Sequence, residues 1–534
     1  MITADTVYGA FCDSAAQWPD RPFLNVMPET AQIYDIEAGE ISYARALVQV
    51  GSYVAQLKSA GYRKGQRVML LLENRPDYFL WFLACNAIGV SVVPINPDLR
   101  AAELSYMINH AEPVLAICIA HRSKELRKAA KSAGVDMAVM EPHGSLPHAQ
   151  TDMCIAARGG DPEAALLYTS GTTGQPKGCI LTNEYFIEAG RWYSAATGIC
   201  AITTDHERMI TPLPIFHMNA MAFSFMAMVA VGGCLTALDR FHPSTWWDSV
   251  RRSKSTCLHY LGVMPSMLMG AEPSAQDINH TIRFGFGAGI DPKLHAAFEQ
   301  RFGFPLSEGW AMTETGAGGT ICANREPRVI GKSSIGSPDE KVQARLVDDA
   351  GKDSDHGELL VRAAGADPRK GFFAGYFKNQ AATDEAWQGG WFHTGDIVRR
   401  EADGTMYFVD RKKNVIRRSG ENIAAVEVES ALAKHPSIKS VAVAAVPDGI
   451  RGDEVFACIV PKGAGTSEMA IEITQWCLRQ LAYYKAPGYI AFVEELPVTA
   501  TQKLQRATLK TLANTLLGDP ATIDLRHLKK RIKA

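Results

Sequence analysis

The chain has 534 residues, more than a single hydrophobic core usually organises, so at least two domains are expected. Its 47% of hydrophobic and 21% of charged residues are typical of a soluble globular protein. The formal net charge of −2 provides no broad electrostatic attraction to nucleic acid or to an anionic membrane surface. Neither is therefore an expected partner.

The cysteines and the first residues indicate a reducing compartment. The chain has 11 cysteines, an odd number, with no C-x-x-C pair and no Cys/His cluster at metal-ligand spacing. The opening "MITADTVYGAF" has an acidic residue where a signal peptide has basic ones, and no secretory apolar run follows. We therefore expect a cytoplasmic protein without a disulfide framework or a structural zinc site.

The first 120 residues alternate predicted strands and helices. Strands are predicted at 67–74, 90–96 and 113–120, with helices at 76–89 and 100–112 between them. Such βαβ alternation predicts a buried, mainly parallel sheet with helical cover.

An uncharged segment at 218–238, "MNAMAFSFMAMVAVGGCLTAL", is about long enough to cross a bilayer. Gly232 and Gly233 interrupt it, and the residues after them are typical of a strand. We therefore predict a buried helix, a turn and a buried strand rather than a membrane span.

Further along, short apolar strands at 207–216, 281–289 and 306–312 end in small or turn-forming residues. In open α/β sheets, ligands bind at the carboxyl ends of such strands. At 341–363, two alternating runs flank a Gly/Asp-rich turn and predict a hairpin in a smaller β subdomain.

The prediction is an α/β protein of two domains. A large N-terminal domain of mainly parallel sheets and helices, with a small β subdomain, should span 1–410. A small α+β domain should span 411–534, after the charged "DRKKN" segment.

The stretch "LLYTSGTTGQPKGCILT", 166–182, is rich in glycine and hydroxyl side chains. Small residues let backbone N–H groups approach an anion closely, and hydroxyls add donors, so the stretch suits phosphate. It is not a P-loop, because Pro176 stands where the second glycine belongs. A tight turn between a strand and a helix is the alternative interpretation.

The motif "YTSGTTGQPKG" resembles the signature loop of the adenylate-forming superfamily, which includes acyl-CoA synthetases, peptide-synthetase adenylation domains and beetle luciferases. Four further motifs resemble that family in the expected order: "GWAMTETG", "GWFHTGD", "VDRKKNVIRRSGENIAAVEVE" and "LPVTATQKLQR". The chain as a whole is similar to the branch of carnitine/crotonobetaine-CoA ligase-like and medium-chain acyl-CoA ligases.

The resemblance implies a ligase with a two-step reaction, placed in fatty acid metabolism. A carboxylate attacks the α-phosphate of ATP to give acyl-AMP and pyrophosphate, and the thiol of coenzyme A then displaces AMP. Because the first step brings an anion against a polyanion, it needs cations and oriented donors, including Mg²⁺, more than it needs a base. The implied partner is a small-molecule carboxylic acid, and the sequence leaves a homodimer open.

The resemblance also implies the residues of the ATP site. Thr313 would contact the α-phosphate, and Glu314 would bind the metal. Asp396 would accept hydrogen bonds from the ribose, and Trp310 would stack on adenine where the family has tyrosine. The full set of implied ATP-binding residues is Thr169, Ser170, Gly171, Thr172, Thr173, Gly174, Lys177, Gly287, Ala288, Gly289, Trp310, Asp396 and Arg411.

Lys503 matches the family's catalytic lysine, which bridges the carboxylate and the α-phosphate. Its loop departs from the family pattern, with Val498 in place of lysine and Gln502 in place of glycine, so the loop loses a charge and a permissive residue. Lys413 matches the hinge about which the C-terminal domain is expected to rotate, which makes that domain mobile.

For the second step, the resemblance implies that Gly420 leaves room for the pantetheine arm. His217 would gate its tunnel, although a lone histidine at a strand end could equally be a packing residue. Arg417 and Arg418 are candidates for the CoA phosphates, with a solvated basic face as the alternative.

The acyl pocket is expected to be walled by Trp192, Met218, Asn219, Gly285, Phe286, Ala288 and Gly316. No acidic residue stands where amino-acid-activating relatives hold the α-amino group, because the strand offers Arg283 and Phe286 instead. An amino acid is therefore not the expected substrate, while short aliphatic, aryl and betaine acids stay open.

Three rival functions fit the same motifs: an adenylation enzyme that loads a carrier protein, a luciferase-like oxygenase, and a non-catalytic binding module. The presence of Glu314, Asp396 and Lys503 together favours an enzyme over the binding module.

Overall fold

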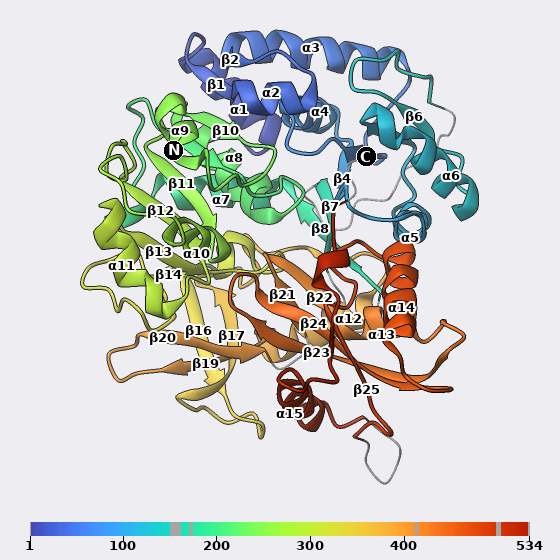
Figure 1. Ribbon diagram of the computed structural model, residues 1–534. Helices are drawn as coiled ribbons and strands as arrows, with labels where there is room; N and C mark the ends of the chain where they lie inside the picture. The colour runs from blue at the N-terminus through green and yellow to red at the C-terminus, as the bar shows by residue number, and fades with distance from the viewer. Residues whose placement is uncertain (1, 150–161, 170–174, 412–414, 498–503, 532–534) are drawn as a thin grey trace.

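A computed structural model describes residues 2–149, 162–169, 175–411, 415–497 and 504–531. The predicted mixed α/β class is confirmed, and the described elements form four sheets with helices packed on them (Figure 1). Two large sheets occupy the N-terminal part of the chain, a small antiparallel sheet follows, and a fourth sheet is built from the C-terminal residues.

The first large sheet has seven strands in the order β18-β8-β7-β4-β3-β5-β6. The predicted βαβ alternation is confirmed, because β4, β3, β5 and β6 pair in parallel. The strands are β3 (Arg67–Leu71), β4 (Ser91–Pro94), β5 (Leu115–Cys118), β6 (Ala138–Met140), β7 (Glu163–Thr169), β8 (Lys177–Thr182) and β18 (Gly375–Tyr376). Its helices are α4 (Pro76–Ala87), α5 (Ala101–Ala111) and α6 (Ser123–Ala133).

The glycine-rich stretch includes the end of β7 and the whole of β8, which pair antiparallel. Its central residues 170–176 therefore connect two strands, and the alternative of a turn between a strand and a helix is wrong. A helix follows only after β8, where the Thr182 hydroxyl caps α7 (Asn183–Ser194) by accepting a hydrogen bond from the backbone N–H of Tyr185.

The second large sheet has eight strands in the order β14-β13-β12-β11-β9-β10-β1-β2. Its six inner strands are parallel, and β2 and β14 close the edges antiparallel. The strands are β1 (Pro22–Val26), β2 (Gly39–Ser42), β9 (Arg208–Thr211), β10 (Cys234–Ala237), β11 (Cys257–Leu261), β12 (Phe284–Ala288), β13 (Leu306–Trp310) and β14 (Ile321–Cys322).

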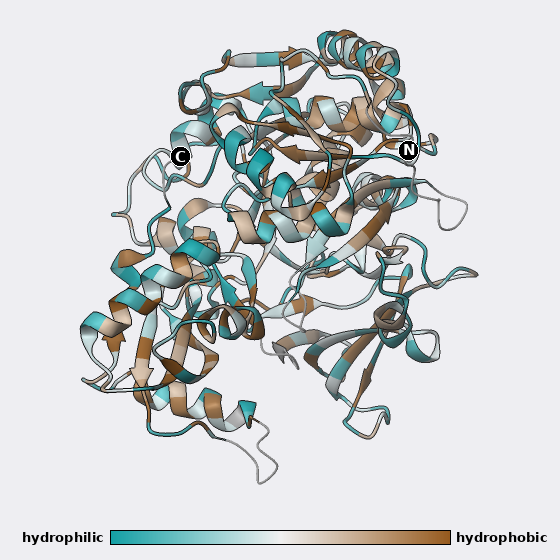
Figure 2. Cartoon of the chain, turned by 90° about the vertical axis from the view of Figure 1, so that its right-hand side faces the viewer, coloured by the Kyte–Doolittle hydropathy of each residue, from teal (hydrophilic) through white to brown (hydrophobic). Residues whose placement is uncertain are grey.

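Helices bury both large sheets in one continuous hydrophobic core. Figure 2 shows apolar residues on the inner strands and helices, with polar residues on the outer helix faces. The remaining helices of this part are α1 (Val7–Gln17), α2 (Pro28–Tyr34), α3 (Tyr43–Ser59), α8 (Phe225–Val231), α9 (Trp246–Ser253), α10 (Val263–Met269) and α11 (Pro292–Phe302), with the shorter η1 (Ala120–Arg122), η2 (Gly198–Cys200) and η4 (Gly316–Gly319).

The apolar segment at 218–238 forms a π-helical turn, η3 (Asn219–Ser224), then α8, a turn and β10. Gly232 adopts φ +61°, and a Cβ at this position would lie 2.2 Å from the Trp18 ring, so glycine is required for the turn. The predicted helix, turn and strand are confirmed. Within the ranges that the structure describes, no helix has the length and apolarity to span a bilayer.

The small sheet has the order β15-β20-β19-β17-β16, and the hairpin predicted at 341–363 is confirmed as its β16–β17 pair. Its strands are β15 (Ser334–Gly336), β16 (Val342–Val347), β17 (His356–Ala363), β19 (Phe392–Arg400) and β20 (Met406–Arg411), with α12 (Gln380–Ala386) and η5 (Gln388–Gly390) beside them.

The C-terminal sheet is covered on both sides. The helices α13 (Ala425–Leu432) and α14 (Ser467–Gln480) bury one hydrophobic cluster, and α15 (Arg506–Leu516) buries a second. The strands are β21 (Val415–Arg418), β22 (Glu421–Ala424), β23 (Ile438–Asp448), β24 (Gly452–Pro461), β25 (Tyr489–Phe492) and β26 (Ile523–Asp524), followed by η6 (Arg526–Leu528). The division of the chain near residue 410 stays a prediction, and Lys413 lies outside the described residues.

Candidate active site

The end of β12 is shaped by close backbone approach, and a buried carboxylate holds the turn that follows it. A Cβ on Gly287 would lie 2.2 Å from the Tyr260 carbonyl oxygen, so only glycine fits there. The buried Glu308 carboxylate accepts backbone hydrogen bonds from Gly289 at 2.8 Å and Ile290 at 3.0 Å, which fixes the turn. Burial raises the pKa of Glu308. Sequence reasoning missed this residue, although a lone acid in the apolar strand "LSEGWAM" was a usable signal.

Two residues predicted for the nucleoside meet in the structure. The Trp310 indole Nε1 donates a 2.9 Å hydrogen bond to the Asp396 carboxylate, and both side chains are buried. Trp310 ends β13 and Asp396 lies in β19, so two different sheets supply the pair. The indole N–H fixes the carboxylate, which is a role for the tryptophan that the sequence did not suggest. The Arg411 side chain lies outside the described residues.

Glu314 lies at the ends of the strands that flank the glycine-rich stretch. Its Oε1 accepts a 2.9 Å hydrogen bond from the Tyr376 hydroxyl and lies 3.4 Å from the Thr169 hydroxyl. The Lys177 ammonium lies 4.6 Å from the centroid of the Tyr376 ring. Burial and the neighbouring Glu314 carboxylate raise the pKa of Tyr376. Tyr376, in "GYFKN", is a second residue that sequence reasoning missed.

The side chains around Glu314 suit the binding of a hard cation that also contacts phosphate. The Glu314 carboxylate and the Thr169 hydroxyl offer oxygen atoms of the kind that Mg²⁺ prefers. No cluster of three or more His, Cys, Asp or Glu that could hold a metal alone occurs in the described ranges. Ligands from the nucleotide would therefore have to complete the coordination shell.

The remaining phosphate residues are only partly described. Thr313 is half-buried beside Glu314. Gly316, predicted for the wall of the acyl pocket, adopts φ +49°. The predicted residues Ser170, Gly171, Thr172, Thr173, Gly174 and Lys503 lie outside the described residues, as do Val498 and Gln502.

Aromatic side chains fill the region predicted for the acyl group. The Trp192 ring centroid lies 5.5 Å from that of Phe223 and 5.6 Å from that of Phe286, and all three side chains are buried. A Cβ on Gly285 would lie 2.6 Å from a Leu306 methyl group, so that glycine serves strand packing. Of the predicted wall residues, Met218 and Asn219 are half-buried.

The hairpin β21–β22 of the C-terminal sheet lies against the carboxyl end of β11. Gly420 adopts φ +90°, and a Cβ there would lie 2.3 Å from the Leu261 Cδ1 atom. Beside it, the His217 Nε2 atom lies 3.5 Å from the Glu421 carboxylate, whose other neighbour is the Asn96 amide at 3.4 Å. The structure thus brings His217 and Gly420, both predicted for the thiol step, to the same place.

Polar contacts hold this arrangement at the start of α5. The buried Lys485 ammonium lies 2.6 Å from the carboxylates of both Glu103 and Glu427. Burial alone would lower the pKa of Lys485, but the two carboxylates raise it. Near the end of the chain, Arg531 pairs with Asp98 at 2.7 Å. Both cations come from the C-terminal part, while Asp98 and Glu103 come from the N-terminal part.

The prediction that Arg418 faces the CoA phosphates is wrong. Arg418 is buried and pairs with Glu454 at 2.8 Å, and Glu454 also binds the buried Lys529. Arg417, one residue earlier in β21, points to the exposed side. Residues of a strand alternate between its faces, and this alternation separates the two arginines.

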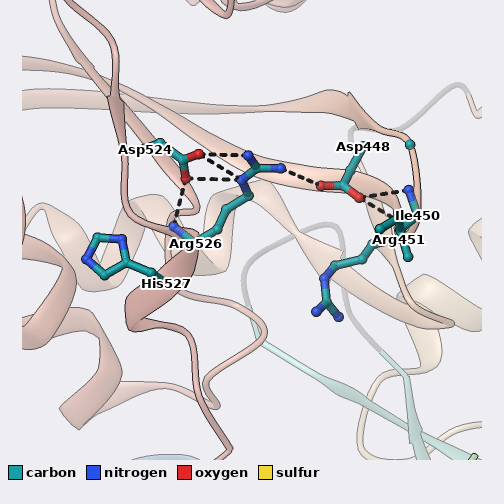
Figure 3. A pocket seen from close by; sticks show the side chains of 7 residues that line it. Asp448, Ile450, Arg451, Asp524, Arg526 and His527 are labelled. Atoms are coloured by element: carbon teal, nitrogen blue, oxygen red, sulfur yellow. Dashed lines mark hydrogen bonds and ion pairs between the residues drawn. The ribbon is translucent and has the colours of Figure 1, made fainter.

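A surface pocket beside this hairpin is lined by both acidic and basic side chains. It has a volume of about 750 Å³ and is lined by Asp448, Gly449, Ile450, Arg451, Asp524, Arg526 and His527. Figure 3 shows the Arg526 guanidinium held between Asp448 and Asp524, while the Arg451 side chain points away from both carboxylates. The Arg451 carbonyl accepts a hydrogen bond from the backbone of Ser419, which places this arginine next to Gly420.

Comparisons with known proteins agree with this geometry. Residues 11–377 match the family model described as AMP-binding enzyme, and residues 427–503 match that of the AMP-binding enzyme C-terminal domain. A sulfoacetate–CoA ligase from Cupriavidus necator is 31% identical over 95% of this chain and 97% of that protein. A crotonobetaine/carnitine–CoA ligase from Escherichia coli is 29% identical over 90% of this chain and 96% of that protein.

A solved structure of an o-succinylbenzoate CoA synthetase from Bacillus subtilis has a TM-score of 0.77 and 24% identity, covering 94% of this chain and 97% of that one. At this identity, the likeness supports the fold.

Proposed function

The chain belongs to the AMP-binding enzyme family and is an ATP-dependent acid–CoA ligase, and from this premise we propose which of its residues perform each step. The predicted resemblance to the crotonobetaine/carnitine–CoA ligases is confirmed. The observation that carries the residue assignment is the meeting of Thr169, Lys177 and Glu314 around Tyr376, at the ends of the strands that flank the glycine-rich stretch.

In the first step, Lys177 provides positive charge for the ATP phosphates, and the N–H groups and hydroxyls of the glycine-rich stretch add oriented donors. Asp396, fixed by Trp310, accepts hydrogen bonds from the ribose. Glu314 and Thr169 would hold Mg²⁺, which when bound supplies charge stabilisation to the transferring phosphate. Lys503 is expected to offset the repulsion between the carboxylate and the α-phosphate.

In the second step, the thiol is proposed to reach the acyl carbonyl beside Gly420, whose lack of a side chain lets the β21–β22 turn pack closely against Leu261. His217 lies next to this path and contacts Glu421, in keeping with a gate that responds to docking of the C-terminal hairpin. Arg451 replaces Arg418 as the proposed cation for a CoA phosphate, because it borders the pocket beside Gly420.

The proposed acid is short. This part of the proposal is supported by the contacts that Trp192 makes with Phe223 and Phe286, which close together in the region predicted for the acyl group. The relatives above act on sulfoacetate and on crotonobetaine or carnitine, which are all short acids. A cytoplasmic location and a place in fatty acid metabolism stay predictions.

The test is to measure AMP and pyrophosphate formation across a panel of short acids, with and without CoA and with a carrier protein in place of CoA. We expect AMP, pyrophosphate and an acyl-CoA, with activity lost when Mg²⁺ is chelated. ADP as the product would refute the adenylate mechanism, and activity with a carrier protein alone would favour the carrier-loading alternative. In the same panel, Trp192→Ala should extend activity to bulkier acids without changing the KM for ATP.

A further inference from the structure

Trp192, Phe223 and Phe286 form what we call the aromatic wall of the site. Next to it, a fully buried histidine connects a chain of hydrogen bonds. His259, in β11, lies with its Nε2 2.8 Å from the Tyr193 hydroxyl. Its Nδ1 lies 2.7 Å from the Asn219 Oδ1 and 2.8 Å from the Ser224 hydroxyl oxygen. Phe286, which pairs with His259 in the neighbouring strand β12, covers this group with its ring centroid 5.4 Å from the imidazole.

The direction of each hydrogen bond follows from the chemistry of the partners. A carboxamide oxygen can only accept, so His259 must carry its proton on Nδ1 and donate it to Asn219. Burial lowers the pKa of His259 to about 3, so the ring is neutral and its Nε2 must accept from the Tyr193 hydroxyl. Ser224 in turn donates to the backbone carbonyl oxygen of Asn219 at 3.3 Å.

In this arrangement the Asn219 side-chain oxygen accepts the hydrogen bond from His259, and the amide nitrogen of Asn219 can donate to another partner. Across the described ranges no hydrogen bond is recorded for that nitrogen, and the residue is half-buried. Asn219 opens η3, two residues after His217, and it is tied through His259 to the strand next to Phe286. Asn219 thus lies between His217 and Phe286, in the region predicted for the acyl group.

We infer that Asn219 selects a short carboxylic acid whose tail bears a hydrogen-bond-accepting oxygen, and that Tyr193 and His259 are positioning residues that hold the amide for it. The inference rests on the proposed ligase function and adds the chemistry of its acid. An apolar tail would leave both N–H groups unpaired in a desolvated site, and such discrimination is typically worth a factor of about 10 or more. A quaternary ammonium tail would face donors with the wrong sign of partial charge.

Four acids that share a tetrahedral tail on an acetate group separate these cases: methylsulfonylacetate, sulfoacetate, 3,3-dimethylbutanoate and glycine betaine. In that order, their tails present neutral hydrogen-bond acceptors, anionic acceptors, methyl groups on carbon and methyl groups on a cationic nitrogen. We expect kcat/KM for at least one of the two acceptor acids to exceed the values for 3,3-dimethylbutanoate and betaine by about tenfold or more. A preference for either non-accepting acid would overturn the inference, while CoA-dependent AMP formation from it would leave the ligase function standing.

The variants test the amide directly. Asn219→Ala should bring the ratio of kcat/KM between the best acceptor acid and 3,3-dimethylbutanoate close to one. Asn219→Asp keeps an oxygen for His259 but replaces the donors with a carboxylate, so betaine should gain relative to both acceptor acids. Because each result is a ratio within one variant, partial loss of folded protein does not change it. An unaltered ratio in Asn219→Ala would overturn the inference.

The positioning role has a matched control on the same helix. Tyr193→Phe removes only the donor to His259 and should lower the acceptor preference severalfold without changing the KM for ATP. Tyr185→Phe removes a buried hydroxyl that has no hydrogen-bond partner among the described residues, and it should leave the ratio unchanged. Equal effects of both variants on the ratio would show that Tyr193 acts only through packing.

Discussion

Replacing Gly420 with alanine should slow the thioester step while sparing adenylation. The residue adopts φ +90°, and the added Cβ would lie 2.3 Å from the Leu261 Cδ1 atom. The variant therefore introduces two separate penalties, a local backbone strain and a steric clash across the interface. They act on different equilibria and can be measured apart.

The backbone strain is of about 1–3 kcal/mol and belongs to the β21–β22 turn itself. It is present whether or not the hairpin is docked, so it should lower stability without favouring one orientation. The clash with Leu261 arises only in the docked arrangement, and overpacking of this kind typically costs about 1–3 kcal/mol. At about 1.4 kcal/mol per factor of ten, the rate of the thioester step should fall by roughly 5- to 150-fold.

The assay measures two half-reactions in each variant, ATP–pyrophosphate exchange and conversion of supplied acyl-AMP to acyl-CoA. We expect Gly420→Ala to retain exchange and lose the thioester step, and Leu261→Ala in the same chain to restore most of that loss. Gly389→Ala, at φ +63° with no atom within 4 Å of the added Cβ, is the control for strain alone. Equal losses in both half-reactions, or no restoration by Leu261→Ala, would refute the reasoning.

Three further predictions concern other parts of the site. Glu314→Gln should lower the rate of ATP–pyrophosphate exchange by on the order of 100-fold or more. Tyr376→Phe should raise severalfold the Mg²⁺ concentration needed for half-maximal exchange, as a Mg²⁺ titration would measure, with thermal unfolding as the control. If neither variant changes the Mg²⁺ dependence, the metal must bind elsewhere. Arg451→Ser should raise the KM for CoA about fivefold with exchange unchanged, and an unaltered KM would remove Arg451 from the CoA site. Burial and the neighbouring Arg418 lower the pKa of Lys529 to about 7, so this amine can become neutral when its partner is removed, whereas Arg418 cannot. Glu454→Gln therefore leaves the buried Arg418 guanidinium unpaired and should lower the free energy of unfolding by about 3–5 kcal/mol. Lys529→Met keeps the Arg418–Glu454 pair and should change it by about 1 kcal/mol or less, as denaturant unfolding would measure; equal effects would contradict this account.

Local patterns predicted the fold well. The alternation of apolar segments and their lengths located the strands and helices between residues 67 and 120, and the Gly/Asp turn located the β16–β17 hairpin. These features depend on neighbouring residues, so a single sequence contains them. The glycine-rich stretch was misjudged in its alternative interpretation, because composition indicates a turn but not whether a strand or a helix follows it.

The site was predictable only where a motif names its residues. The bond between Trp310 and Asp396 joins residues 86 positions apart in different sheets, and no local pattern indicates such a partner. Glu308 was missed for the same reason, since its hydrogen bonds reach the neighbouring strand's turn. The prediction for Arg418 was wrong for a different reason. The sequence shows two adjacent arginines, and only the register of β21 reveals which one is buried.

We predict that the C-terminal part moves between the two steps. Gly420 and His217 meet at the end of β11, held there by the pair that Lys485 forms with Glu103. The backbone N–H of Gln505 donates a 2.8 Å hydrogen bond to the carbonyl of Pro497, so these two residues lie together at the start of α15. That helix packs on the opposite face of the C-terminal sheet from α13 and α14, and Figure 1 shows it at the far end of the molecule from β7 and β8. We therefore predict that adenylation uses a second orientation of the C-terminal part, in which the Lys485–Glu103 contact is broken.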